Sequence, residues 1–197
     1  MSKTSIIEKI INSPVAGKAG VPQGYPLRRW KAGEPALDGG VMLGGEGRIA
    51  DFLGRALAGD YDILAPGDRA ALLFDATSLT TPDRLRELYD FFHPHMRSLR
   101  PNARIVVVGT TPESLHDTQA RITARALEGF VRSLAKELRK GATANLVWVD
   151  PDAVGEVEAT VRFFLSAKSA FVDGQVVRVS ARPTDGATSP TDWARPA

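Results

Sequence analysis

The sequence predicts an α/β protein in which helices cover both faces of a mostly parallel sheet of five to six strands. The first observation is a run of four β-branched residues at positions 105–108. A run that is apolar on both faces suits a central parallel strand between two helical layers. The second is the alternation of short apolar runs with helix-patterned segments after residue 40. This alternation is typical of βαβ units with right-handed crossovers, which predicts a three-layer αβα architecture.

Short apolar runs supply the expected strands. They lie at residues 41–43, 61–64, 70–75, 104–110, 144–149 and 175–179. The expected helices follow the glycine-rich residues 44–47, ending near residue 58, and lie at 81–99, 117–140 and 156–166.

Two of these helices carry specific signals. Thr81 is the expected N-cap of its helix because Pro82 follows at the first helical position, and Pro94 is expected to kink or split that helix. In the segment 117–140, apolar residues that include Ile122 and Leu127 recur at helical spacing and predict its buried face.

Two segments flank the predicted α/β domain, which spans residues 41–180. Residues 1–40 combine a short amphipathic helix at 4–12 with a Pro- and Gly-rich stretch expected to wrap over the domain surface. The basic and aromatic residues 27–31 within it are either a docking patch or a solvated segment with Trp30 packed on the body. Residues 181–197 have the composition of a linker.

The composition excludes several classes of protein. The chain has 197 residues, a formal net charge of +2 and no cysteine. Scattered basic residues and balanced charge argue against a nucleic-acid partner. The absence of cysteine excludes disulfides, thiolate metal sites and a cysteine nucleophile. Because no apolar run is long enough to cross a bilayer and the first residues are not a signal peptide, we expect no membrane partner and a cytoplasmic location.

Residues 45–50, Gly-Glu-Gly-Arg-Ile-Ala, follow a strand and open a helix, as G-x-G-x-x-A dinucleotide-binding loops do. The same glycines also suit a tight strand-to-helix turn. Against a nucleotide, the strand at 61–64 ends without an acid to hold a ribose, and Glu46 would lie near the phosphates. Both interpretations stay open.

Groups for acid–base chemistry are sparse. No tyrosine is followed four residues later by lysine, the spacing that would place both on one helix face. Ser114, His116 and Asp117 have the residue types of a hydrolase triad, but they are nearly adjacent and no G-x-S-x-G elbow is present. His93 and His95 are expected at the surface near the Pro94 kink, and no metal site is expected.

Three segments resemble short-chain dehydrogenase/reductases. Residues 126–138 resemble the long helix of that family, 164–177 its closing helix, loop and last strand, and 104–110 the strand that carries its catalytic serine. The resemblance covers roughly residues 70–180. It places Thr110 at the serine position, and Ala120 and Ala124 at the tyrosine and lysine positions. Because a methyl group cannot transfer a proton, it implies no catalytic residue in this chain.

The family normally has another helix and strand where this chain has almost no residues, before residue 70. Their removal gives the flavodoxin-like strand order 2-1-3-4-5, derived from a Rossmann-like fold. Taken whole, the chain resembles the N-terminal domain of high-molecular-weight 3-oxoacyl-[acyl-carrier-protein] reductases. In those proteins a non-catalytic domain precedes a complete NADH-dependent one, which implies that residues 181–197 lead toward a catalytic reductase domain.

This resemblance implies an accessory role in fatty-acid metabolism, through docking onto the C-terminal reductase domain of the same polypeptide and through homodimerisation. No cofactor is expected for this chain, and NADH is expected for the second domain of the parent. The alternatives are a nucleotide- or acyl-carrier-binding module and an active NAD(P)-dependent short-chain reductase. Any residual cofactor pocket is expected at Gly44, Gly45, Gly47, Arg48, Asp75, Ala76, Gly109 and Thr110.

Overall fold

The computed structural model describes residues 24–63 and 69–181. The predicted helix at 4–12 and most of the predicted linker lie outside these residues. Within the described part, no helix is both long and apolar enough to cross a membrane.

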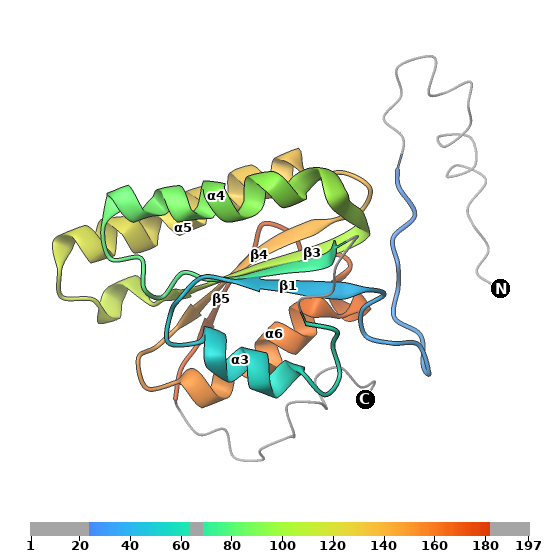
Figure 1. Ribbon diagram of the computed structural model, residues 1–197, viewed down its shortest axis with the longest axis horizontal. Coiled ribbons are helices and arrows are strands. Elements are labelled where there is room, and N and C mark those ends of the chain that lie inside the picture. Colours follow the sequence, from blue (N-terminus) through green and yellow to red (C-terminus); the bar gives the residue numbers. More distant parts are fainter. Residues whose placement is uncertain (1–23, 64–68, 182–197) are drawn as a thin grey trace.

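Five parallel strands form one sheet, in the order in which they occur along the chain (Figure 1). They are β1 (Gly40–Gly44), β2 (Arg69–Asp75), β3 (Leu99–Thr110), β4 (Thr143–Val149) and β5 (Val176–Val179). The segment expected as a strand at 61–64 makes one isolated parallel bridge, from Ile63 to Val41 on the free side of β1. The predicted order is therefore present, with its edge strand reduced to a single bridge in the described residues.

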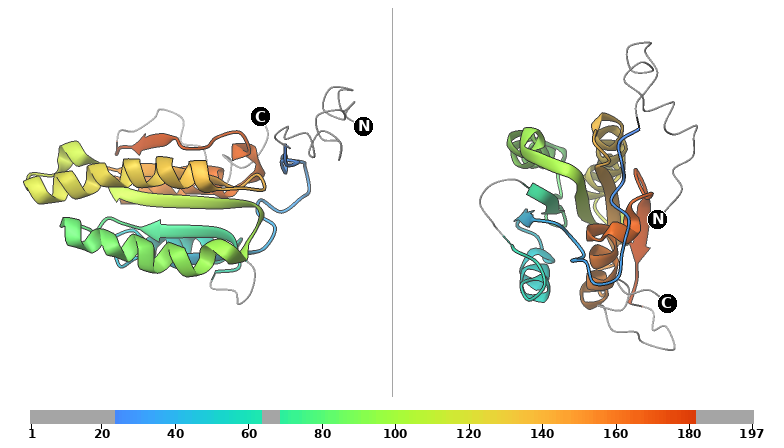
Figure 2. Two further views of the ribbon diagram at one scale, coloured as in Figure 1. Left: turned by 90° about the horizontal axis from the view of Figure 1, so that it is seen from above. Right: turned by 90° about the vertical axis from the view of Figure 1, so that its right-hand side faces the viewer.

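Helices cover both faces of the sheet (Figures 1 and 2). One layer holds α3 (Ala50–Leu57) and α6 (Val157–Leu165), and the other holds α4 (Arg86–His95) and α5 (Thr118–Glu137). Short 3-10 turns, which join these elements, lie at Pro82–Leu85, Met96–Ser98, Pro112–Ser114, Val154–Glu156 and Ala167–Ser169.

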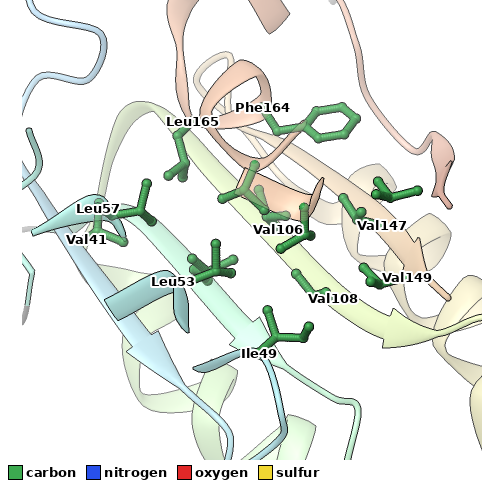
Figure 3. Packing of buried hydrophobic residues seen from close by; sticks show 14 of the residues in the cluster. Val41, Ile49, Leu53, Leu57, Val106, Val108, Val147, Val149, Phe164 and Leu165 are labelled. Carbon is green, nitrogen blue, oxygen red and sulfur yellow. The ribbon is translucent and has the colours of Figure 1, made fainter. Parts of the chain in front are cut away.

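The apolar run in β3 supplies both layers of the core. Val106 and Val108 pack toward α3 and α6, as Figure 3 shows, whereas Ile105 and Val107 pack toward α4 and α5. Successive side chains of a strand point to opposite faces, so a strand between two helical layers needs apolar residues at every position. Full burial of each such side chain stabilises the folded chain by about 1.5–3 kcal/mol. Because exposing either face of this run would lose that energy, the run indicates a strand covered on both faces.

Three local expectations need correction. Thr81 makes no side-chain cap; the chain first forms the 3-10 turn Pro82–Leu85, and α4 begins only at Arg86. Pro94 lies in the last turn of α4, which ends one residue later, so the proline ends the helix and does not split it. Ile122 is 56% exposed, because α5 turns its small residues Ala120 and Ala124 toward the sheet.

The last crossover differs in hand from the others. The connections β2–α4–β3 and β3–α5–β4 step across the sheet in one direction over one face. The connection β4–α6–β5 steps in the same direction over the opposite face. All strands are parallel, so the last connection has the opposite hand, and the expectation of uniformly right-handed crossovers is wrong for it.

Candidate functional site

The carboxyl ends of β1 and β2 meet at the point where the chain direction reverses. From β1 the chain passes through α3 to the Ile63 bridge on one side, then returns to β2 on the other side. Open α/β sheets bind ligands at such a switch point, beyond the carboxyl ends of the strands. The residues found there are the glycine-rich loop 44–47, Arg48, and residues 75–77.

The carboxylate of Asp75 fills the space between these two strand ends. Its Oδ2 accepts hydrogen bonds from the backbone N–H groups of Ile49 and Ala50, both at 2.7 Å. Its Oδ1 accepts from the backbone N–H of Thr77 at 2.9 Å and from the Thr77 hydroxyl at 2.7 Å. Asp75 is 1% exposed. The carboxylate therefore satisfies the start of α3 in the position that an anion would otherwise take.

Two glycines permit this arrangement. Gly45 has φ +86°, and a Cβ there would overlap the carbonyl oxygen of Asp75. A Cβ at Gly47 would overlap the Asp75 carboxylate and the Thr77 hydroxyl. The glycines of the G-x-G-x-x-A motif thus admit a protein carboxylate and its hydroxyl partner. The N–H groups of Ile49 and Ala50, which lie where such a loop ordinarily meets a phosphate, are bonded to Asp75 here.

Arg48 lies across the carboxyl ends of the strands. This side of the sheet is called the carboxyl edge below, and the side formed by the amino ends of the strands is called the amino edge. Its backbone N–H donates to the Thr77 hydroxyl at 3.0 Å, and its Nη2 donates to the carbonyl oxygen of Val149 at 2.9 Å. Burial lowers the pKa of its guanidinium, and the charges of Asp75 and Asp150 oppose that shift. The side chain therefore ties the loop after β1 to the end of β4.

The three positions that the resemblance aligns with the family's catalytic residues lie between β3 and α5. A hollow of about 10 Å³ is lined there by residues that include Ala76, Thr110, Ala120 and Ala124. That volume corresponds to about one water molecule. The structure thus brings Thr110 and both alanines together around this small space.

The other two glycines of the predicted pocket pack against aromatic rings. A side chain at Gly44 would meet the ring of Phe91, and one at Gly109 would meet the ring of Trp148 and the side chain of Leu127. Both glycines therefore allow close packing beneath α4 and α5.

The remaining candidate residues have structural partners. The side chain of Asp117 caps α5 by accepting from the Ala120 N–H at 2.8 Å. His93 stacks on Tyr89 with ring centroids 4.7 Å apart, and His95 contacts the edge of Phe91. Among the residues that the structure describes, no group of three or more His, Cys, Asp or Glu side chains could hold a metal ion.

Sequence reasoning missed a second hollow, which lies at the other end of the strands. A hollow of about 540 Å³ opens at the amino ends of the strands, lined by residues that include Tyr25, Arg139, Lys140 and Phe171. The basic and aromatic composition of residues 27–31 was the one available signal, since that segment passes along this edge.

Comparison with known proteins finds likeness in structure alone. No family model matches the chain, and no curated protein matches its sequence. Several solved structures match it, and the three described below share 14–16% identity with it. A mutant short-chain dehydrogenase/reductase of Serratia marcescens has a TM-score of 0.56, with 75% of this chain and 98% of that chain covered. BdcA in complex with NADPH has a TM-score of 0.54 at 74% and 94% coverage. A short-chain dehydrogenase family protein of Francisella tularensis has 0.53 at 74% and 98%. The chain therefore has the Rossmann-like α/β fold of short-chain dehydrogenase/reductases.

Proposed function

We propose that this chain is a non-catalytic accessory domain of an NADH-dependent 3-oxoacyl-ACP or -CoA reductase, acting through interdomain docking and dimerisation. The observation that carries the proposal is the pair of methyl groups at Ala120 and Ala124. They line the small hollow beside Thr110. The resemblance to short-chain dehydrogenase/reductases assigns them to the tyrosine and lysine positions of that family. Without an acid at this place, a carbonyl cannot receive its proton during hydride transfer.

The Asp75 carboxylate supports the same proposal from the cofactor side. A structural neighbour, BdcA, was determined with NADPH. In this chain a buried carboxylate already bonds the first N–H groups of α3, and a dinucleotide phosphate would have to displace it against charge repulsion. We therefore expect neither NADH nor NADPH to bind at this edge.

Exposed apolar side chains on the α4–α5 layer support the dimerisation part. Tyr89 on α4 and Ile122 on α5 are both 56% exposed. Large apolar side chains at the surface are common at contact sites between copies of a chain. We expect Ile122→Glu with Tyr89→Glu to shift sedimentation toward the monomer, while Ala32→Glu, on the segment outside this layer, leaves the distribution unchanged.

Nucleotide titration and turnover test the central claim. We expect no saturable change in NADH or NADPH fluorescence when the chain is added, and no oxidation of either nucleotide with acetoacetyl-CoA. The matched control is Arg48→Ala, which removes the side chain that crosses the carboxyl edge. Saturable nucleotide binding that Arg48→Ala weakens would contradict an accessory role, and so would turnover by the chain alone.

A further inference from the structure

Hydrogen bonds of two asparagine side chains hold the segments that border the hollow at the amino edge of the sheet. On one side, Asn102 accepts from the Arg28 N–H at 3.0 Å and donates its own backbone N–H to the Lys140 carbonyl at 2.8 Å. On the other side, Asn145 donates its side-chain N–H to the Val172 carbonyl at 2.9 Å. Its Oδ1 accepts from the Gln175 N–H at 3.1 Å. Two buried or half-buried amides thus fix the segments that border the hollow.

Aromatic side chains lie exposed at its rim. Phe171 is 70% exposed and Tyr25 is 44% exposed, and both line the hollow. The guanidinium of Arg29 lies 5.3 Å from the centre of the Phe171 ring, and the ammonium of Lys168 lies 5.6 Å from that of Trp30. These cation–π contacts join the segment after residue 24 to the loop after α6. Aromatic residues and arginine are the types enriched at the centres of protein interfaces.

The charge of this edge is positive. Arg139 and Lys140 line the hollow, and their side chains form no ion pair within the described part of the chain. Beneath it lies the buried guanidinium of Arg104, which donates to carbonyl oxygens that include Gly141 at 3.3 Å. Burial lowers the pKa of Arg104 to about 10, and the nearby Arg28 adds to this shift. Asp173, the carboxylate in the lining, is bonded to the Ala144 N–H at 2.8 Å.

We propose that this surface, defined by Tyr25, Phe171, Arg139 and Lys140, docks an acidic, extended segment of a partner protein that carries an apolar side chain. A positive rim favours carboxylates, and the open aromatic walls offer an apolar contact that remains in water when no protein covers it. A second copy of this chain presents the same positive surface, so charge disfavours self-association there. The inference rests on the proposed function, because it names the surface through which an accessory domain would hold its partner.

The test uses the full chain and a fluorescein-labelled peptide in which runs of glutamate flank a central Leu-Phe pair. We expect saturable anisotropy that weakens as salt is added, because exposed charges are screened. Arg139→Glu with Lys140→Glu should raise Kd by at least about tenfold, and Phe171→Ser by about fivefold. The charge-matched control, Arg55→Glu with Arg121→Glu, should leave Kd within about twofold, since both arginines are exposed elsewhere and form no ion pair in the part of the chain that the structure describes.

Several outcomes would overturn the inference. They are the absence of saturable binding, equal binding of a peptide with lysine in place of glutamate, and equal losses in the control variant. Displacement of the peptide by inorganic pyrophosphate at matched ionic strength, as effectively as by unlabelled peptide, would indicate a small-anion site instead. Circular dichroism of each variant checks that its fold is intact. NADH titration of the same samples reports separately on the proposed function, so the two can fail independently.

Discussion

The carboxyl and amino edges of the sheet differ in whether their charged groups have partners within the chain and in how much open space they contain. At the carboxyl edge, a buried carboxylate, its hydroxyl partner and tightly packed glycines fill the place where this fold ordinarily holds a nucleotide. At the amino edge, Arg139 and Lys140, which have no ion pair within residues 24–63 and 69–181, lie with exposed aromatic rings around an open hollow. The polar groups at the carboxyl edge thus have hydrogen-bond partners within the chain. The cations and aromatic side chains at the amino edge remain accessible to another molecule.

The largest expected effect comes from removing the Asp75 carboxylate. Asp75→Ala leaves several buried donors without an acceptor, and we expect the free energy of unfolding to fall by about 3–5 kcal/mol. Urea denaturation measures this change. Asp152→Ala, an exposed aspartate near the same edge, should change it by less than about 0.5 kcal/mol. A loss at Asp75 no larger than at Asp152 would remove the contrast between the edges.

Matched glycine substitutions sharpen the comparison. Gly45 and Gly33 both have positive φ, at +86° and +81°, but only Gly45 has backbone within reach of an added Cβ. Gly45→Ala should therefore cost about 2–4 kcal/mol, combining strain with overlap. Gly33→Ala, with open space around it, should cost about 1 kcal/mol. Equal melting temperatures for the two variants would show that the loop after β1 is not tightly packed.

Restoring the missing side chains tests whether the filled edge can be made catalytic. Ala120 and Ala124 are both 4% exposed and lie on α5, which packs against β3 and β4. We expect Ala120→Tyr with Ala124→Lys to lose about 1–3 kcal/mol of stability through overpacking. We also expect no NADH oxidation with acetoacetyl-CoA, because the phosphate position stays occupied by Asp75. Measurable turnover would mean that the two alanines alone account for the lost chemistry.

The smallest effect concerns the Glu113 ion pair at the carboxyl edge. A hydrogen bond from Arg178, together with the charge of Arg125, lowers the pKa of Glu113 from 4.5 to about 2. Because the folded-state pKa is lowered, the ionised pair stabilises the folded chain above about pH 4.5, and this contribution is lost as the pH falls toward 2. Wild type should therefore exceed Glu113→Gln in stability at neutral pH, and this difference should shrink as the pH falls from about 4.5 through 2. A constant difference across this range would exclude the pair as its source.

The sequence predicted the layers well because they depend on periodic burial. The apolar run in β3 and the repeating apolar positions of α5 are all buried when helices pack on both faces of the sheet. Ile122 was wrongly predicted to lie on the buried face of α5, because the periodic pattern was identified mainly from large apolar side chains. The sheet instead receives Ala120 and Ala124, whose small side chains let α5 approach closely.

The site was harder to predict because its contacts join distant residues. Asp75 was expected only as one residue of a residual cofactor pocket, and its partners Ile49 and Ala50 lie about 25 residues earlier. No local pattern indicates that an anion position will be filled from within. The amino-edge hollow is bordered by an irregular segment, which has no period to interpret.

The reversed hand of the last crossover also has a consequence for folding. It returns α6 to the layer of α3, where Arg162 reaches Asp60 and the carbonyl of Ala56, separated from it by 102 and 106 residues. The α4–α5 layer, by contrast, is built from consecutive segments. Closing a long loop costs more chain entropy than closing a short one. During synthesis the α4–α5 layer can therefore assemble early. The contact between α3 and α6 can form only after almost the entire domain has been synthesised.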